Sequence, residues 1–149
     1  MYLKMKVCDV SCDIQFSTQT HLIESERKSD ETTCIYYTNL YPYKLNQKLY
    51  ITLHRCDKPL TKRELIDNLS ASLASTTDEY ESRDQFPEIP IDQQMGYMGN
   101  GTRSDLYGKN ESVSVIWYTK KKYHVSIYSE LPSFITRQIA DTFTSAEVT

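Results

Sequence analysis

Two stretches with a period of two, followed by one with a period near 3.6, make the C-terminal third the most readable part of the chain. Residues 112–118 and 123–128 each alternate between mainly apolar and mainly polar residues, and a charged tip at 119–122 separates the two stretches. This pattern is typical of a β-hairpin. The segment 133–143 then places apolar residues every four positions, at Ile135, Ile139 and Phe143. It predicts an amphipathic helix that buries one side on the sheet.

The same two periods occur upstream. Residues 48–55 alternate, which predicts a strand with Leu49, Ile51 and Leu53 on one face. The segment 60–76 predicts the first helix, with an apolar side formed by Leu65, Ile66, Leu69 and Leu73. Thr61 and Glu64 form a T-x-x-E capping box, in which the two side chains accept backbone N–H groups at the helix start. Shorter strands are expected within residues 6–16, 20–23 and 34–39.

All four glycines fall between Gly96 and Gly108. The run G-Y-M-G-N-G is not followed by the Lys-Ser/Thr pair of a phosphate-binding loop, and its order is not that of a dinucleotide fingerprint. Asn100-Gly101 is instead a strong signal for a two-residue hairpin turn. We therefore expect a turn at 100–101, with short strands at 95–98 and 104–107.

The connector 77–92 is acidic. It carries six carboxylates against one base, Arg83, and contains Pro87 and Pro90. Paired carboxylates serve acid–base chemistry or calcium binding in other proteins, but the glycine and alternating oxygen ligands of a calcium loop are missing here. The composition favours a solvated loop.

These elements predict an α+β fold in a single domain, residues 1–149. We expect an antiparallel sheet that contains 48–55, 112–118 and 123–128, with two main α-helices near 61–75 and 133–143 packed on it. The chain of 149 residues is long enough for a substantial core.

The overall charge argues against nucleic acid as a partner. Net charge is −3, so no basic field would hold nucleic acid. No apolar run is long enough to cross a bilayer, and the first ten residues lack the apolar core and cleavage site of a signal peptide. Either the protein is cytoplasmic, or this is a mature form whose export signal has been removed.

Catalytic and metal-binding patterns are weak. The four cysteines, Cys8, Cys12, Cys34 and Cys56, do not form two closely spaced ligand pairs, so we expect no metal site. No motif places a base beside a nucleophile. We therefore expect no cofactor, no catalytic residues and no enzymatic activity.

Tyrosine is common, with 12 copies, and it suits half-exposed sheet faces and interfaces. Residues Tyr36, Tyr50, Tyr118 and Tyr128 of the expected strands are the candidate contacts with another protein. The alternative is that these rings cover the sheet beneath the helices.

Read in order, the chain resembles the gliding-motility lipoprotein D family of Bacteroidetes. The resemblance is carried by short motifs: Cys12-Asp-Ile-Gln-Phe16, Ile23-Glu24, Cys34, Tyr41-Pro42, Leu45-Asn46, the strand from Lys48 to Leu53, and Tyr107-Gly108. The final hairpin departs from the family pattern, with Thr119-Lys-Lys-Lys and Val125-Ser-Ile in its place. The element order is also similar to the PsbP/Mog1-like group, an antiparallel sheet flanked by helices.

The resemblance implies a protein-binding component of the bacterial cell envelope or periplasm, connected with gliding motility and type IX secretion. It implies a membrane link only through a lipid anchor absent from this chain. If the protein is exported, a disulfide between Cys12 and Cys34 is expected, because both lie in expected strands and match the family's pair. A small soluble inhibitor or immunity protein that neutralises a toxin or enzyme fits the same composition.

Overall fold

The computed structural model describes residues 3–8, 12–18, 21–27, 33–39, 47–55, 57–104, 106–121 and 123–147. Side chains are described for 14–17, 47–53, 57–104, 106–121 and 123–146. Every strand pairing within these ranges is antiparallel.

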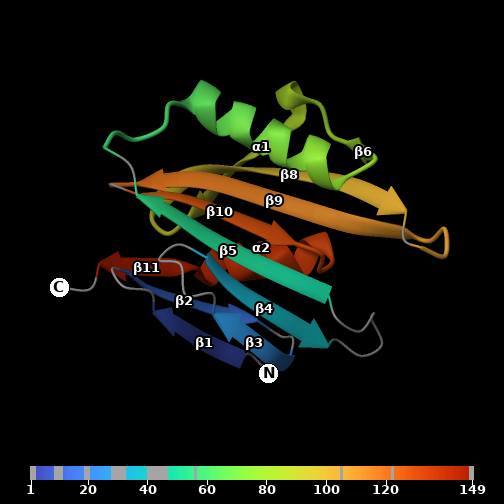
Figure 1. Ribbon diagram of the computed structural model, residues 1–149. Helices are drawn as coiled ribbons and strands as arrows, with labels where there is room; N and C mark the ends of the chain where they lie inside the picture. Colours follow the sequence, from blue (N-terminus) through green and yellow to red (C-terminus); the bar gives the residue numbers. More distant parts are fainter. Residues whose placement is uncertain are drawn as a thin grey trace.

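The strands form two sheets (Figure 1). The larger follows the order β3-β4-β5-β10-β9-β8, and both β6 and β7 pair along the outer side of β8. Its strands are β3 (His21–Arg27), β4 (Thr33–Asn39), β5 (Gln47–Arg55), β6 (Glu79–Tyr80), β7 (Glu88–Ile91), β8 (Gln94–Ser104), β9 (Asn110–Lys120) and β10 (Tyr123–Ser129). The smaller sheet has the order β1-β2-β11, with β1 (Leu3–Cys8), β2 (Cys12–Thr18) and β11 (Thr144–Glu147).

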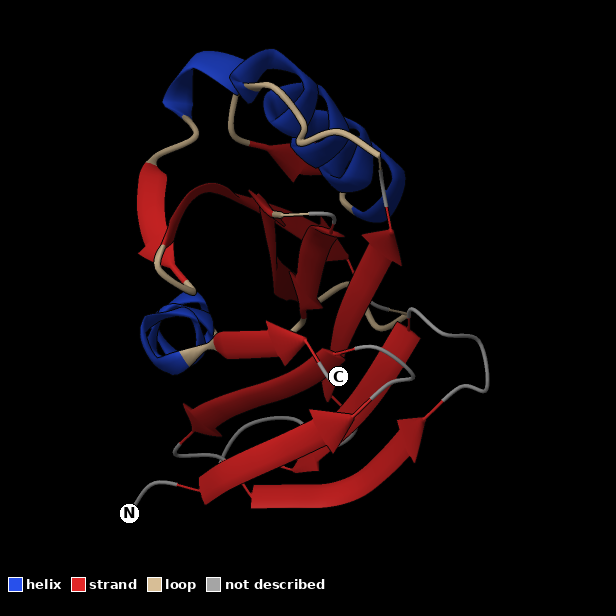
Figure 2. Cartoon of the chain, turned by 90° about the vertical axis from the view of Figure 1, so that its left-hand side faces the viewer, coloured by secondary structure: helices blue, strands red, loops and turns tan. Residues whose placement is uncertain are grey.

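The described residues contain two α-helices, which lie on opposite sides of the larger sheet (Figures 1 and 2). Helix α1 (Lys62–Thr76) packs over β8 and β9. Helix α2 (Ser133–Thr142) packs against β2, β7 and β9. The expectation of an α+β fold with antiparallel sheets and two helices is thus confirmed at this level, and the helices and the strands at 48–55, 112–118 and 123–128 are where the sequence predicts them.

The first core lies between the two sheets and α2. It joins one face of β5, β9 and β10 to β2 and to the apolar side of α2. The rings of Phe16 in β2 and Phe143 after α2 stack with centroids 6.1 Å apart. Ile135 and Ile139 are buried, so the apolar side predicted for this helix does face the protein interior.

The second core lies between α1 and the other face of the sheet. Leu65, Leu69 and Leu73 of α1 are buried there against Val113 and Val115 of β9. The capping box at the start of α1 is also confirmed. The Thr61 hydroxyl accepts the Glu64 N–H at 3.2 Å, and the Glu64 carboxylate accepts the Thr61 N–H at 3.1 Å.

The predicted turn at Asn100-Gly101 is wrong, because β8 runs without interruption from Gln94 to Ser104. The tight turn lies earlier, at Asp92 and Gln93, whose φ values of 53° and 61° are those of a type I′ hairpin. Tertiary packing explains the glycine in mid-strand. A Cβ at Gly101 would lie 2.7 Å from the Glu79 backbone oxygen of β6.

Two other expectations are corrected in part. The acidic connector is not a plain loop: it forms β6, the 3-10 turn η1 (Arg83–Gln85) and β7, and it buries Ile89 and Ile91 in the first core. The segment 6–16 is not one strand, since it contributes to the separate strands β1 and β2. Among the described residues, no helix has the length and apolarity that a membrane span requires.

The contact between β6 and Gly101 gives a stability prediction. Gly101→Ala should lower the free energy of unfolding by about 1–3 kcal/mol, because the new methyl group meets backbone that a rotamer change cannot move. Denaturant melts measure the loss. Thr102→Ala, one residue along and exposed, is the control and should stay within about 0.5 kcal/mol of wild type. A Gly101→Ala protein as stable as wild type would show that β6 does not lie close to β8.

Candidate protein-binding site

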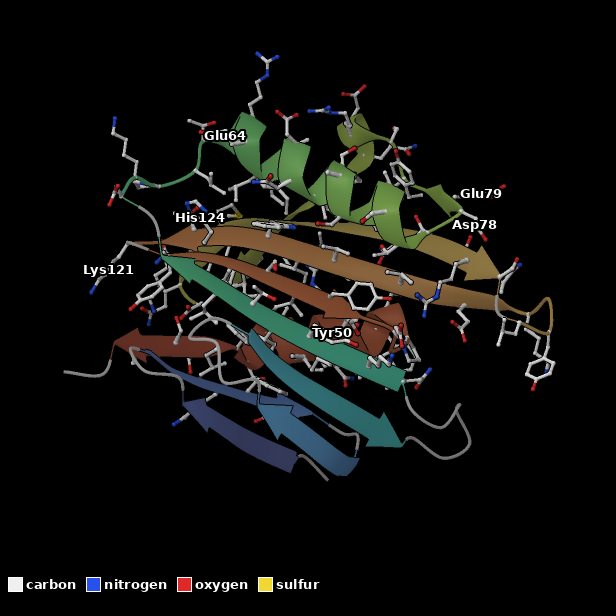
Figure 3. The ribbon with its side chains drawn as sticks, viewed as in Figure 1. Tyr50, Glu64, Asp78, Glu79, Lys121 and His124 are labelled. Carbon is white, nitrogen blue, oxygen red and sulfur yellow. The ribbon has the colours of Figure 1, made fainter. Side chains whose placement is uncertain are left out.

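Helix α1 covers only part of its side of the larger sheet. It packs on β8 and β9, and the next strands, β10 and β5, extend beyond it (Figure 1). We call the exposed part of β10 and β5 the open face, and define it by five partly exposed residues: Tyr50, Thr52, His124, Ser126 and Tyr128. Figure 3 places Tyr50 on the sheet below α1 and His124 near the start of that helix.

Tyr50 and Tyr128 form the centre of the open face. They are register partners on β5 and β10, so both side chains project from the same side of the sheet. Their ring centroids are 5.5 Å apart with an interplanar angle of 53°. Tyr128 also packs against the edge of the α1 core, whereas Tyr50 lies one strand further out. Two aromatic rings thus share one partly exposed surface.

A polar network fixes the Tyr128 hydroxyl. Arg103 Nη1 donates to this hydroxyl at 2.9 Å, and the hydroxyl donates to Glu130 Oε2 at 2.8 Å. The Arg103 guanidinium also pairs with Glu130 through Nη2 and with Glu111 through Nε, the latter at 3.0 Å. Glu130 in turn accepts the Lys48 N–H at 3.1 Å. Strands β8, β9, β10 and β5 are therefore tied together beneath one end of the open face.

The network alters the protonation of its members. Burial alone would lower the pKa of Arg103, but the hydrogen bond to Glu111, together with the charge of Glu130 and the hydrogen bond to it, outweighs burial and raises that pKa. Burial, followed by the hydrogen bond to Glu130 and the charge of that carboxylate, raises the pKa of Tyr128 above its ordinary value. The site holds a cationic guanidinium and a neutral phenol at physiological pH.

Tyr118 does not belong to this face, so its prediction as a partner contact is wrong. Its side chain is fully buried in the first core, edge-on to Phe143 with ring centroids 6.2 Å apart. Its hydroxyl donates to Asp92 at 2.8 Å. The parity of β9 explains the placement, because both faces of this central strand are covered.

Three other predicted residues have side chains outside the described part of the structure: Tyr36, Cys12 and Cys34. The backbone of Tyr36 in β4 is the register partner of Leu49, not of Tyr50. The backbones of Cys12 and Cys34 lie in β2 and β4, one in each sheet. The disulfide remains a prediction.

The sequence analysis did not identify Arg103, Glu111 or Glu130 as members of this site. Arg103 and Glu111 are cross-strand partners on β8 and β9, and opposite charges at such positions are a usable signal. The expected turn at 100–101 hid this signal, because it left Arg103 and Glu111 outside the expected strands 104–107 and 112–118.

No group of three or more His, Cys, Asp or Glu side chains among the described residues lies close enough to hold a metal ion. The His124 ring nitrogen Nε2 lies 3.3 Å from the Lys58 backbone oxygen. No family model matches the chain, and no curated protein matches it.

The coupling between Arg103 and Glu130 can be measured with a double-mutant cycle. Arg103→Gln, Glu130→Gln and the double variant should give a coupling free energy of about 1–2 kcal/mol, because the pair is partly buried and shares Tyr128. The Lys62–Glu88 pair, 3.8 Å apart and well exposed, is the control and should couple by less than about 0.5 kcal/mol. Equal coupling in the two cycles would contradict a special role for the Arg103 network.

The raised pKa of Tyr128 predicts a pH dependence. A group whose pKa is higher in the folded than in the unfolded protein contributes stability that is fully present below its unfolded pKa, about 10 for tyrosine. Stability should therefore fall as pH rises above that value. Tyr128→Phe should flatten this alkaline fall in denaturant midpoint relative to wild type. Equal slopes for the two proteins would contradict a raised pKa of Tyr128.

Proposed function

We propose that this protein is a non-enzymatic binding module that contacts another protein through the open face. The observation that carries the proposal is the pairing of Tyr50 and Tyr128 on a sheet surface that α1 leaves partly exposed. Tyrosine is enriched among residues that dominate interface energy, since its large ring and polar tip suit a surface that alternates between water and partner.

The polar network supports the same proposal through preorganisation. Arg103 and Glu130 hold the Tyr128 hydroxyl, and Tyr128 in turn contacts the Tyr50 ring. A ring already held in one position loses little conformational freedom on binding, and such immobilisation otherwise costs about 0.5–1.5 kcal/mol for each side chain. The open face is therefore ready to dock without rearrangement.

For the biological setting, we propose an accessory component of the bacterial cell envelope. The resemblance to gliding-motility lipoproteins supports this setting, and an antiparallel sheet flanked by helices is compatible with a PsbP/Mog1-like sandwich. Attachment to the membrane would require a lipid anchor outside this chain. The alternative is an inhibitor or immunity protein whose open face blocks a toxin or enzyme. Both settings use the same surface and differ in the partner.

Site-specific photo-crosslinking tests the proposal. Benzoylphenylalanine in place of Tyr50 should capture one discrete protein in cells of the native organism. The same group in place of Asp141, exposed on α2, is the control and should not capture that protein. With the captured protein purified, Tyr50→Ala should weaken its affinity about tenfold, whereas Asp141→Ala, outside the open face, should change it less than about twofold.

The captured protein also separates the two settings. A secretion or motility component that fractionates with the envelope supports the first, and a toxin or enzyme whose activity the chain abolishes supports the second. Undiminished affinity of a folded Tyr50→Ala protein would refute binding through the open face.

A further inference from the structure

The pair Asn100-Gly101 carries a chemistry that the proposed function does not use. Of the asparagines in the chain, only Asn100 precedes a glycine, and such pairs deamidate readily in flexible chains because glycine has no Cβ to shield its backbone nitrogen. That nitrogen gives up its proton to the solvent and bonds to Cγ of Asn100, while the side-chain nitrogen takes up a proton and leaves as ammonia. Water then opens the cyclic imide at one of its two carbonyls, which gives aspartate or isoaspartate at position 100.

Strand β6 and the residue after it hold this pair from the outer side of β8 (Figure 1). The Glu81 carboxylate accepts the Asn100 N–H at 2.6 Å, and the Asn100 backbone oxygen accepts the Glu81 N–H at 3.0 Å. Successive residues of a strand direct their N–H and C=O groups to opposite edges, so those of Gly101 point to β9, where Val113 is its register partner. Gly101 is buried, and its nitrogen is therefore held in the sheet away from solvent.

Close packing and a side-chain hydrogen bond restrict the pair further. A Cβ at Gly101 would lie 2.7 Å from the Glu79 backbone oxygen and 2.7 Å from Cγ2 of Thr77, so the backbone there has little room to rotate. The Asn100 side-chain oxygen accepts the Ser114 hydroxyl at 2.6 Å. Closure of the imide ring requires the Asn100 side chain and the following peptide group to turn toward each other. The sheet opposes both movements.

We propose that Asn100-Gly101 is a latent deamidation site, which the sheet protects and which reacts only in molecules where β6 has separated and this end of the β8–β9 pair has opened. Strand β6 has two residues and lies at an edge of the larger sheet, and residues 100–104 lie at the turn end of β8. Local opening here therefore costs less free energy than global unfolding. The reaction proceeds from the open form, so the fraction of open molecules determines the overall rate.

Isoaspartate at position 100 would make the opening permanent. The main chain would then run through Cβ and Cγ of this residue, which lengthens the backbone of β8 by one carbon. The residues that follow would lose their register with β9, including Arg103 opposite Glu111. Arg103 would no longer hold the Tyr128 hydroxyl. The loss of this brace matters for binding only if the proposed function of the open face is correct, whereas the deamidation itself does not depend on that function.

Peptide mapping by mass spectrometry tests the site. The protein is incubated in mildly alkaline buffer, with and without denaturing urea, and the conversion of Asn100 to aspartate and isoaspartate is followed over time. In urea, Asn100 should react faster than any other asparagine of the chain. In the native protein its rate should be at least about tenfold lower than in urea. A synthetic peptide of residues 97–104 in the same two buffers corrects for any effect of urea on the reaction itself.

Variants of the connector test the part that β6 plays. Glu81→Ala removes the acceptor of the Asn100 N–H and should raise the native rate about tenfold, because a hydrogen bond to a charged group is lost on opening only in the wild type. Glu81→Gln keeps an oxygen that can accept this N–H and should react more slowly than Glu81→Ala. Asp84→Ala, exposed in η1, is the control and should stay within about twofold of the wild-type rate.

Three results would overturn the proposal. They are equal rates in native buffer and in urea after the peptide correction, an unchanged rate in a folded Glu81→Ala protein, and the same acceleration in the Asp84→Ala protein. A melting curve like that of wild type confirms that the Glu81→Ala protein is folded. If it is not, amide exchange of the wild type decides instead. The Asn100 N–H should exchange through local opening, and exchange only through global unfolding would contradict the proposal.

Discussion

The buried carboxylate of Asp92 joins the smaller sheet to the larger one, two parts of the fold that no backbone strand pairing among the described residues connects. Only 2% of its side chain is exposed, so its charge must be met inside the protein. It accepts the Tyr118 hydroxyl at 2.8 Å, Lys120 Nζ at 2.9 Å and the Ser145 N–H at 3.0 Å. Lys120 also donates to the Ser145 backbone oxygen at 2.7 Å. The outer side of β11 is thereby bonded to the turn between β7 and β8, and the smaller sheet is locked over the larger one.

This closure determines which surface is left open. The smaller sheet and α2 together cover one face of the larger sheet, while α1 alone lies on the other. A helix is about 10 Å wide and strands lie about 4.8 Å apart, so one helix covers about two strands. Helix α1 covers β8 and β9, and β10 and β5 remain outside its reach. The open face follows from this geometry, and the side chains on it follow from strand parity.

The periodicity of the sequence predicted the structural elements that depend on local residue patterns. The central hairpin, both helices and the Thr61 capping box could be found because amphipathic periods and cap chemistry act over a few residues. The parity of β5 likewise separated Tyr50 from Leu49 and Ile51 correctly. The alternation of residues along β9 could not predict the burial of Tyr118, because β9 is buried on both faces and neither set of alternate residues is polar throughout.

Long-range packing determined the position of the turn and the pairing of Arg103 with Glu111, which local patterns did not predict. Asn100-Gly101 has the best local turn signal in the chain, yet Gly101 lies in mid-strand, where β6 approaches so closely that no side chain fits. The turn falls at Asp92-Gln93, a pair with weaker turn preference, whose carboxylate the buried network requires at that point. The Arg103–Glu111 pair became visible only once β8 and β9 were paired correctly.

The register of the β8–β9 pair determines which side chains reach each face of the larger sheet. Arg103 and Glu111 project to the α1 side and brace Tyr128, whereas Asn100 and Ser112 project to the α2 side. A slip of one residue would exchange these two sets, because successive side chains of a strand point to opposite faces. Gly99 and Gly101 resist such a slip, since a Cβ at either position would lie 2.7 Å from Leu73 or from the Glu79 backbone oxygen. The glycines that suggested a turn thus help to keep Arg103 and Glu111 on the side of the open face.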